Sequence, residues 1–237
     1  MPSLETLHRA AERSGLVPRG GLRLAAAERL GPLAHASSLV LLGMAGATTW
    51  PAFVASPEFA DGGPHPLDRW SRRVIGALAD ALGGVAVFPF DGPPYWPFQR
   101  WAQRADSVWP SPLGLLIHAE YGLWHSYRGA LAFAGEIEVP LREAEKNPCE
   151  ACSEKPCLGA CPVAAFMGSG YDVEACAGHL RAPQGSDCLS RGCLARRACP
   201  VGREHAQGAG QAGFTMRAFL ANRDAASART GSPRTAD

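Results

Sequence analysis

The sequence predicts a protein of the α/β (α+β) class, with a small cysteine-rich module behind a larger domain. Apolar runs and amphipathic stripes follow one another through the first 145 of its 237 residues, enough for one domain with its own core. All eight cysteines then lie between residues 149 and 199. We therefore expect an α/β cofactor-binding domain over residues 1–145, a cluster-binding module over 146–206 and a tail over 207–237.

The N-terminal stretch predicts two short helices. Residues 3–14 can be capped by the Ser3 side chain and ended by Gly15, and their apolar positions share one face. A turn is expected at 20–21, where two glycines meet, and a second helix over 22–30, where Gly-Pro follows. Both helices would precede the first strand.

A continuous apolar run over 38–43 predicts a strand that is buried on both faces. Gly43 and Gly46, which close this run, would let a ligand approach the backbone closely, although glycine after a strand is also common in ordinary loops. The stretch 50–66 is rich in Pro, Gly and Phe and predicts a long loop. Loops of this length are often functional.

A second strand follows a well-marked helix. Pro66 suits the first helical position, and two glycines close the helix at 83–84. The apolar stripe of this helix consists of Leu67, Trp70, Val74, Leu78 and Leu82. Residues 85–88 then predict a strand, so that strand, loop, helix and strand follow one another in the rhythm of an α/β layer.

The segment 90–98 combines prolines with aromatic residues and one acid, so it can form neither a helix nor an inner strand. Because it follows a strand, it is well placed to line a pocket, which would bring Asp91, Tyr95 and Trp96 to a cofactor or substrate. The alternative is a tight loop whose rings fill the core and in which Asp91 starts a turn.

The remaining apolar runs of the domain predict a helix over 99–105 and strands over 113–118 and 124–133, with a turn at 121–122 between the strands. His118 and His125 would lie on neighbouring strands, and we interpret both as structural histidines. In the tail, residues 214–222 predict a short packed helix, and the chain from Ala225 is expected to be disordered.

The cysteine spacing favours two cubane [4Fe–4S] clusters. The first run reads Cys-x2-Cys-x4-Cys-x3-Cys-Pro and the second Cys-x4-Cys-x5-Cys-Pro, with one cysteine between them. In two-cluster ferredoxins, the cysteine before proline serves the other run's cluster. The first predicted ligand set is therefore Cys149, Cys152, Cys157 and Cys199. The second is Cys161, Cys176, Cys188 and Cys193, in which Cys176 and Cys188 could exchange roles.

Two other uses of these cysteines are open. Zinc also takes four cysteines, but zinc modules usually show separated Cys-x2-Cys pairs, and only one such pair occurs here. Disulfides need an oxidising compartment, and the N-terminus has no basic stretch followed by an apolar run that would direct export. Reduced thiols for cluster binding favour the cytoplasm.

Composition excludes some partners. The net charge of +1 gives no electrostatic reason to expect a nucleic acid, and no apolar run is long enough for a bilayer. Five arginines flank the second cysteine run: Arg181, Arg191, Arg196, Arg197 and Arg203. They would raise the reduction potential of an anionic cluster or dock an acidic electron donor, or else form an ordinary solvated face.

Several stretches resemble the epoxyqueuosine reductase family and, more distantly, the reductive dehalogenases. Trp101-Ala102-Gln103-Arg104-Ala105 is similar to that family's Trp-Ala-x-x-Ala segment, and Leu115-Leu116-Ile117 with Tyr121-Gly122-Leu123-Trp124 to its strand and Gly-Ser-Trp turn. The order of the cysteines is also similar, and the resemblance covers about residues 35 to 200. It implies a nitroreductase-like N-terminal domain that holds cobalamin, followed by a ferredoxin-like module with two [4Fe–4S] clusters.

The resemblance also implies roles for single residues. Asp91 with Pro94 looks like the family's Asp-x-x-Pro, in which the aspartate donates a proton. Aromatic surroundings would favour the protonated carboxyl group. The family's glycine-rich Gly-Leu-Gly-Trp-Ile-Gly-Lys segment is replaced here by residues 106–112, which keep Trp109 as a further candidate cofactor contact. The family's C-terminal repeat domain, which helps to hold tRNA, has no counterpart, so tRNA is not expected as the substrate.

The leading hypothesis is therefore an oxidoreductase, an iron–sulfur reductase that passes electrons from two clusters to a corrinoid in the N-terminal domain. Its electron donor would be a protein of the ferredoxin or flavodoxin class, and its substrate a small molecule. One alternative is a ferredoxin-like electron carrier without corrinoid. Another is a corrinoid-processing protein, for which the corrinoid is the substrate and loses its upper ligand.

Overall fold

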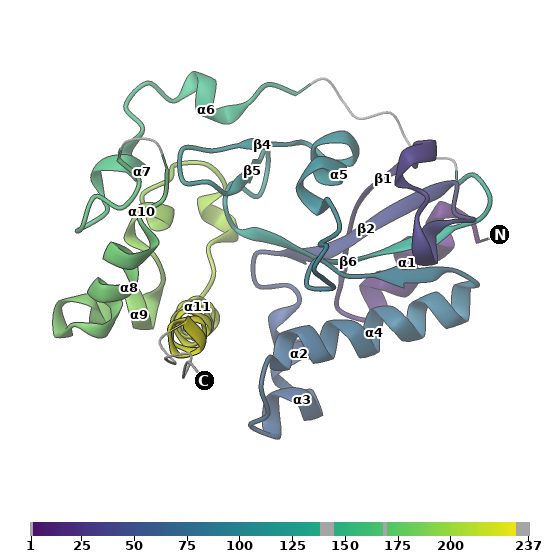
Figure 1. The fold of residues 1–237 in the computed structure, drawn as a ribbon. Coiled ribbons are helices and arrows are strands. Elements are labelled where there is room, and N and C mark those ends of the chain that lie inside the picture. Colours follow the sequence, from purple (N-terminus) through teal and green to yellow (C-terminus); the bar gives the residue numbers. More distant parts are fainter. Residues whose placement is uncertain (1, 138–144, 168–169, 231–237) are drawn as a thin grey trace, which may run out of the picture.

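The computed structural model describes residues 2–137, 145–167 and 170–230, which form an N-terminal lobe and a C-terminal module (Figure 1). The elements of the N-terminal lobe are α1 (Leu4–Arg13), β1 (Val17–Arg23), β2 (Ser38–Ala45), α2 (Trp50–Val54), α3 (Pro57–Ala60), α4 (Pro66–Leu82), β3 (Val85–Val87), α5 (Phe98–Ala105), β4 (Val108–Pro110), β5 (Leu116–His118) and β6 (His125–Phe133). Those of the module are α6 (Pro148–Ala151), α7 (Pro156–Gly159), α8 (Val173–Arg181), α9 (Ser186–Arg191) and α10 (Leu194–Arg197), and α11 (Ala209–Thr230) follows as the last helix.

A four-stranded antiparallel sheet in the order β1-β2-β6-β3 forms the centre of the N-terminal lobe. Both β2 and β3 pair antiparallel with β6, so they run parallel to each other with α4 as the connection. The predicted order of strand, helix and strand is present, but β6 lies between the two strands in the sheet. The mixture of helices with antiparallel sheets confirms the α+β class.

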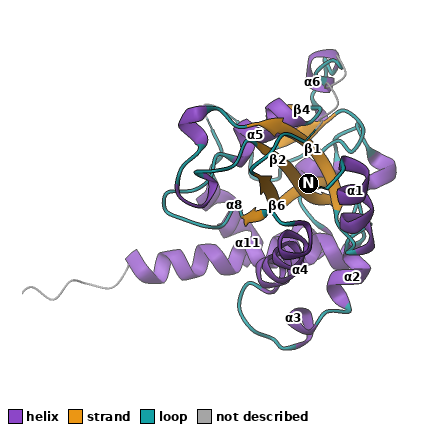
Figure 2. Ribbon diagram, turned by 90° about the vertical axis from the view of Figure 1, so that its right-hand side faces the viewer, coloured by secondary structure: helices purple, strands orange, loops and turns teal. Residues whose placement is uncertain are grey.

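The sheet has an apolar layer on each face, and alternate residues of one strand enter opposite layers. Val40 and Leu42 pack with residues of α1 and α4, whereas Leu39 and Leu41 pack with Trp101 of α5. Figure 2 shows α4 on one side of the strands and α5 on the other. All eight residues of β2 are buried, so the prediction of a strand buried on both faces is confirmed.

Several predicted boundaries are also confirmed. Ser3 caps α1, because its side chain accepts a hydrogen bond from the Thr6 amide. Pro66 begins α4, and Gly83 ends it in the left-handed region (φ 68°) that favours glycine. The predicted helix over 99–105 and the predicted strand over 124–133 correspond to α5 and β6.

The predictions for residues 20–30 were wrong. The two glycines lie inside β1, where the register with β2 shifts between Pro18 and Gly21. A Cβ on Gly20, whose φ is 78°, would fall 2.0 Å from the carbonyl oxygen of Ala105, so this position needs glycine. Instead of a helix over 22–30, the strand continues to Arg23, and a short 3₁₀ helix covers Ala26–Glu28. Strand pairing therefore overrides the local helical pattern.

The predicted loop over 50–66 contains α2 and α3. Pro51 and Pro57 stand in the first turns of these helices, where a missing N–H costs nothing, so they begin helices rather than prevent them. The two helices carry an aromatic cluster in which the rings of Trp50 and Phe53 lie 5.6 and 5.4 Å from that of Phe214 of α11. This cluster joins the N-terminal lobe to the last helix.

The last helix, α11, is longer than the predicted helix over 214–222. It continues to Thr230, so the expected disorder from Ala225 was wrong as far as this residue, and residues 231–237 lie outside the described part. In Figure 1, α11 lies between the module and the lower helices of the N-terminal lobe. In the described part of the chain, no helix is both long enough and apolar enough to cross a bilayer.

Candidate functional site

The structure brings the cysteines together in the two predicted sets, named here group A (Cys149, Cys152, Cys157 and Cys199) and group B (Cys161, Cys176, Cys188 and Cys193). All eight are free thiols. Burial raises the pKa of the Cys149 and Cys157 thiols, and the neighbouring group A sulfurs raise it further. Burial and group B neighbours do the same to Cys176 and Cys193. Each group therefore needs added positive charge before its thiols can all ionise.

Within the described ranges, no set of three or more Cys, His, Asp or Glu side chains converges on the position of a single metal ion. A cubane makes a different demand, because its four thiolates bind four different irons and so stand further apart than the ligands of one ion. Two groups of four thiols provide the donor set that two cubanes require. The role of the cysteines as cluster ligands stays a prediction.

Group A lies against the short β4–β5 hairpin of the N-terminal lobe. Leu113 and Ile117 belong to the same apolar cluster as Cys157 and Cys199, and Trp109 packs on its edge. Trp109 was predicted to contact a cofactor in the N-terminal domain. The structure places it at the edge of the apolar cluster that contains Cys157 and Cys199, and its contact with a cofactor stays a prediction.

Group B surrounds a small cavity that Phe166, Leu180 and Met216 help to line. The Ala165 amide donates a hydrogen bond to Cys161 Sγ at 3.3 Å, and Tyr171 lies close to Cys176. Burial and the contact with Cys176 raise the pKa of Tyr171, so its hydroxyl stays protonated and remains a donor.

A pocket of about 350 Å³ lies between the two lobes and is called here the interlobe pocket. The N-terminal lobe contributes Met44, Leu67, Leu123, His125 and Arg128 to its lining, among others, and the module and α11 contribute Arg196, Gln207, Gln211, Phe214 and Thr215. Leu194 and Ala195 of α10 line the group B cavity while Arg196 lines the pocket. On α11, Met216 lines the cavity and Thr215 the pocket. The two spaces therefore share a wall formed by two helices.

Arg196 connects the cysteines with the interlobe pocket. Its Nε and Nη2 donate to the Leu123 carbonyl at 2.9 and 2.6 Å, and its guanidinium lies 4.6 Å from the centre of the Trp124 ring. Burial lowers the Arg196 pKa to about 10, and the Cys193 thiolate opposes this shift, so the side chain remains a cation at neutral pH. It is the one of the five predicted arginines that lines the pocket.

The other arginines near the cysteines have partners of their own. Arg181 pairs with Asp224 of α11 at 2.6 Å, and both Arg191 and Arg197 pair with Asp187. Arg203 donates to the Cys199 carbonyl at 3.4 Å. These contacts hold the module together, and they leave less charge for docking an acidic protein than the sequence alone suggests.

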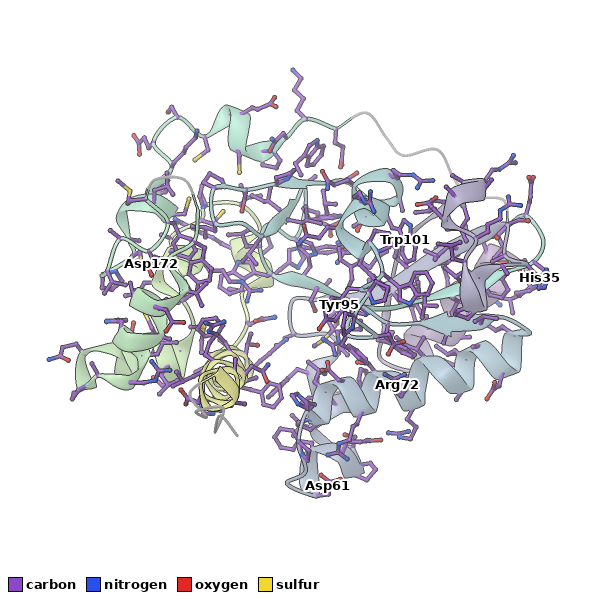
Figure 3. All side chains as sticks on the ribbon, in the orientation of Figure 1. His35, Asp61, Arg72, Tyr95, Trp101 and Asp172 are labelled. Atoms are coloured by element: carbon purple, nitrogen blue, oxygen red, sulfur yellow. The ribbon has the colours of Figure 1, made fainter. Side chains whose placement is uncertain are left out.

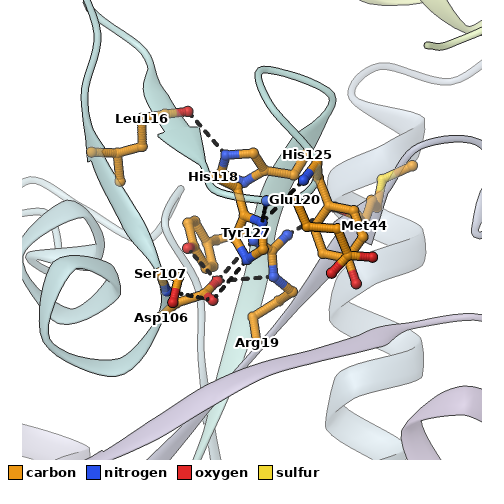
Figure 4. A network of polar contacts seen from close by, with 10 residues as sticks. Arg19, Met44, Asp106, Ser107, Leu116, His118, Glu120, His125 and Tyr127 are labelled. Carbon is orange, nitrogen blue, oxygen red and sulfur yellow. Dashed lines mark hydrogen bonds and ion pairs between the residues drawn. The ribbon is translucent and has the colours of Figure 1, made fainter. Parts of the chain in front are cut away.

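A buried polar network lies next to the interlobe pocket (Figure 4). Asp106 accepts hydrogen bonds from Arg19 Nε at 2.9 Å and from the Tyr127 hydroxyl at 2.8 Å. His118 Nε2 lies 3.2 Å from the other oxygen of Asp106, and His118 Nδ1 accepts from the amides of Glu120 and Tyr121, so the ring carries its hydrogen on Nε2. Burial alone would raise the Asp106 pKa, but these contacts and the charge of Arg19 lower it strongly.

His125 lines the interlobe pocket and is held in one tautomer. Its Nε2 donates to the Leu116 carbonyl at 2.9 Å, and its buried Nδ1 has no hydrogen-bond partner in the described part of the chain. Burial, helped by the charge of Arg19, lowers the pKa of His125 to about 3. His125 is therefore neutral at pH 7. The two histidines lie on strands that follow one another in the chain, β5 and β6, but these strands belong to different sheets, and the ring centres are 5.8 Å apart.

Asp91, the predicted proton donor, does not line the interlobe pocket. Its carboxylate forms an ion pair with Arg72 of α4, so it has a cation beside it rather than a purely aromatic environment. It lines a second, aromatic pocket of about 560 Å³ together with Tyr95 and Trp96. Trp96 stacks on Trp101 at 5.9 Å, whereas Tyr95 is 66% exposed (Figure 3).

Gly43 and Gly46 make close contacts with the protein itself. A Cβ on Gly43 would fall 2.1 Å from the Ser126 carbonyl oxygen, and one on Gly46 would fall 3.1 Å from that of His205. The Gly46 carbonyl also accepts a hydrogen bond from Gln211 of α11 at 3.0 Å. Strand pairing and contact between the lobes thus account for the close packing of both glycines, and their predicted role at a ligand stays a prediction.

Sequence patterns reveal little of the residues that form the interlobe pocket and the buried polar network beside it. Arg19, Asp106 and Tyr127 are far apart in the chain, and no local motif marks them. Gln211 and Thr215 belong to a Gly- and Ala-rich stretch with no apolar stripe. Only their position in the folded chain shows what they surround.

No family model and no curated protein matches this sequence. Solved structures of epoxyqueuosine reductases are similar in fold. A selenomethionine-labelled crystal structure gives a TM-score of 0.54 at 15% identity, over 88% of this chain and 68% of that one. A complex with a modified tRNA-Tyr stem loop gives 0.51 at 17%, over 85% and 66%. A Bacillus subtilis structure whose catalytic aspartate loop has swung out of the active site gives 0.50 at 15%, again over 85% and 66%.

At these identities the likeness concerns the fold alone. It agrees with the family that the sequence resembles, and it extends over both the N-terminal lobe and the module. The more distant resemblance to the reductive dehalogenases stays a prediction.

Proposed function

We propose that this protein is an iron–sulfur reductase in which group A and group B each hold one [4Fe–4S] cluster and the interlobe pocket receives the electron acceptor. One observation carries the proposal: α10 and α11 each present neighbouring residues to both the group B cavity and the interlobe pocket. The similarity of the fold to reductases supports it.

Residues of this chain would bind the clusters, balance their charge and exclude water from the pocket. Eight thiolates would bind the irons, and the clusters would supply one-electron transfer. The buried Arg196 would offset negative charge between group B and the pocket. His125, neutral and fixed through Nε2, and the apolar side chains of Leu67 and Phe214 would keep the pocket poor in water and would add no charge to that of the arginines that line it.

Asp91 remains our candidate for the proton donor, and it would have to move to act there. It is held by Arg72 beside the aromatic pocket. In the similar Bacillus subtilis structure, a catalytic aspartate loop has swung out of the active site. We propose that the segment around Asp91 is in a comparable outward position and that release from Arg72 would let it approach the interlobe pocket.

The size of the interlobe pocket bears on which electron acceptor it could receive. A volume of about 350 Å³ is at the lower end of the range for drug-sized ligands, and a corrinoid is several times larger than such a ligand. A corrinoid would therefore need the pocket to widen. This size also favours the second candidate, an electron carrier with two clusters and no corrinoid. A corrinoid-processing role would need the same widening as a corrinoid-dependent reductase.

The expectation that a nucleic acid is an unlikely partner does not agree with the comparisons. It was based on the net charge of +1, which says nothing about a local surface. One of the structures with a similar fold contains a modified tRNA stem loop. A tRNA substrate is therefore included among the acceptors to be tested.

Anaerobic reconstitution tests the proposal. We expect about eight irons and eight sulfides per chain, as two cubanes require. The reduced protein is then titrated with hydroxocobalamin, and turnover is assayed with an epoxyqueuosine-modified stem loop and with small-molecule acceptors. A stoichiometric change in the cobalamin spectrum supports the corrinoid-dependent reductase. Two clusters without binding or turnover would support the carrier, and zinc in place of iron would overturn both.

Asp91→Asn tests the proton donor, with Asp61→Asn as the matched control. Asp61 is also an aspartate of the N-terminal lobe paired with an arginine, Arg69, but it is not among the residues that line either pocket. We expect Asp91→Asn to abolish turnover while the absorbance of the clusters stays unchanged. Equal turnover in Asp91→Asn and the wild type would remove Asp91 from the mechanism.

A further inference from the structure

The aromatic pocket beside Asp91 is separate from the interlobe pocket, and no described residue lines both. It is the larger of the two, at about 560 Å³ against about 350 Å³. Two segments that are far apart in the chain form its walls, residues 27–32 between β1 and β2 and residues 91–101 between β3 and the first turn of α5. Its volume lies within the range of sites for small organic molecules.

The lining of this pocket is aromatic and partly fixed. Trp101 is completely buried, and its Nε1 donates to Glu28 Oε1 at 2.8 Å, which joins the two walls. Trp96 stacks on Trp101 with the ring centres 5.9 Å apart and an angle of 25° between the planes. Tyr95 and Leu30 are 66% and 63% exposed, so apolar surface of both walls remains uncovered. A flat ring system would cover such surface and stack on the aromatic side chains.

The charged side chains of the aromatic pocket leave one cation without a partner. The two acids that line it are neutralised by arginines outside the lining, Glu28 by Arg104 at 2.8 Å and Asp91 by Arg72. Arg100 also lines the pocket, and it makes no ion pair or hydrogen bond with any residue that the structure describes. A guanidinium group pairs well with a carboxylate or a phosphate. The pocket therefore favours an anion, although ring faces alone would favour a cation.

We propose that the aromatic pocket is a second binding site, and that its ligand is a small planar aromatic anion. The ring of the ligand lies against Tyr95 and Trp96, and its carboxylate or phosphate group binds Arg100. Because the ligand contacts both walls, it also keeps the segment that carries Asp91 in the position that the structure shows. The proposal does not depend on the iron–sulfur function, since no described cysteine lines this pocket.

Calorimetric titration of the reconstituted full chain tests the ligand class with matched probes. The planar anions 2-naphthoate and 2-naphthyl phosphate should each bind once per chain, and the tighter of the two identifies the preferred anionic group. Three further probes should bind more weakly than both. Decahydro-2-naphthoate keeps the charge and loses the flat ring, 2-naphthamide keeps the ring and loses the charge, and 2-naphthylmethylammonium reverses the charge.

Two variants test the assigned contacts. Arg100→Gln should weaken the binding of 2-naphthoate about two- to fivefold, as expected for one exposed charge, and should leave 2-naphthamide unchanged. Arg13→Gln, at an exposed arginine of α1 that lines neither pocket, is the matched control and should change nothing. Tyr95→Ala removes an exposed ring, so the fold should persist, and both aromatic probes should bind about two- to tenfold more weakly.

Hydrogen exchange locates the bound probe. Saturating 2-naphthoate should slow amide exchange in residues 27–32 and 91–101 and leave residues 209–215, which include the α11 lining of the interlobe pocket, unchanged. Absence of binding, tighter binding of the ammonium probe, or slowed exchange at 209–215 alone would overturn the inference. A protein that holds no iron and still binds 2-naphthoate in this way would instead overturn only the proposed function.

Discussion

The N-terminal lobe has an apolar layer on each face of a four-stranded sheet, whereas the C-terminal module packs helices of four to nine residues around its cysteines. In the N-terminal lobe, side chains such as Leu41 and Leu131 are completely buried among other apolar groups. In the module, the main buried cluster contains Cys157 and Cys199 themselves, and it depends on Leu113 and Ile117 of the other lobe. One region thus has its own core, and the other is organised around its proposed ligands.

The largest expected effect follows from this difference. Removal of iron from the reconstituted protein by a chelator should unfold the module, because helices of four residues are not stable by themselves and the freed thiols lose what holds them together. The sheet should stay folded. Hydrogen exchange would show fast exchange in α7 and α10 with continued protection in β2 and β6. Equal protection of the module with and without iron would contradict this account.

A smaller effect is expected when the polar network of the N-terminal lobe is broken. Asp106→Asn removes the carboxylate that faces the buried Arg19, and loss of one partner of a buried pair typically costs about 3–5 kcal/mol. Urea unfolding would measure the loss of free energy, and iron content should remain unchanged. Asp61→Asn, at an exposed pair, is the control and should unfold near the wild-type midpoint. A similar midpoint for both variants would show that the network contributes little.

The smallest of the three effects is a pH dependence of the N-terminal lobe. The folded-state pKa of His125 is lowered to about 3 from 6.5, so between these values the unfolded chain binds more protons than the folded one. Stability should therefore be complete above pH 6.5 and decrease as the pH falls toward 3. Between pH 6.5 and 4.5 the free energy of unfolding should fall by at most about 3 kcal/mol, since one pKa unit corresponds to about 1.4 kcal/mol. Unfolding curves of His125→Asn over this range should be flatter than those of the wild type.

The sequence predicted those parts of the fold that local patterns determine. Ser3, Pro66 and Gly83 mark helix ends by their own chemistry, and the apolar run of β2 reflects burial on both faces. Residues 20–23 could not be predicted in this way, because pairing with β2 decides their conformation. The sequence pattern did not predict the length of α11 either. Its contacts lie on different sides of the helix, with Gly213 against Ser190 and Phe214 in the aromatic cluster, so no single stripe results.

The sequence likewise predicted some features of the candidate site and not others. The grouping of the cysteines was predicted from their spacing, together with the rule that the cysteine before proline joins the other run's set. The interlobe pocket draws on residues from Met44 to Thr215, and their convergence depends on how the lobes meet. Asp91 and Tyr95 were selected because they follow a strand, and Asp91 also because it resembles the family's Asp-x-x-Pro; both line the aromatic pocket and neither lines the interlobe pocket.

The last helix has a geometric consequence for the whole molecule. Near its start, Gln211 and Phe214 are anchored to the N-terminal lobe, and one side of its later turns, at Arg223 and Asp224, is anchored to α8 through Glu174 and Arg181. Asp224 lies ten positions after Phe214, which corresponds to a rise of about 15 Å in an α-helix. The helix therefore holds the N-terminal lobe and α8 at a fixed distance and in a fixed rotational relation. Each residue adds about 100° of rotation to the helix. The distance and the rotation between the N-terminal lobe and the module therefore depend on the number of residues between the two anchored parts of α11, and not on any one side chain.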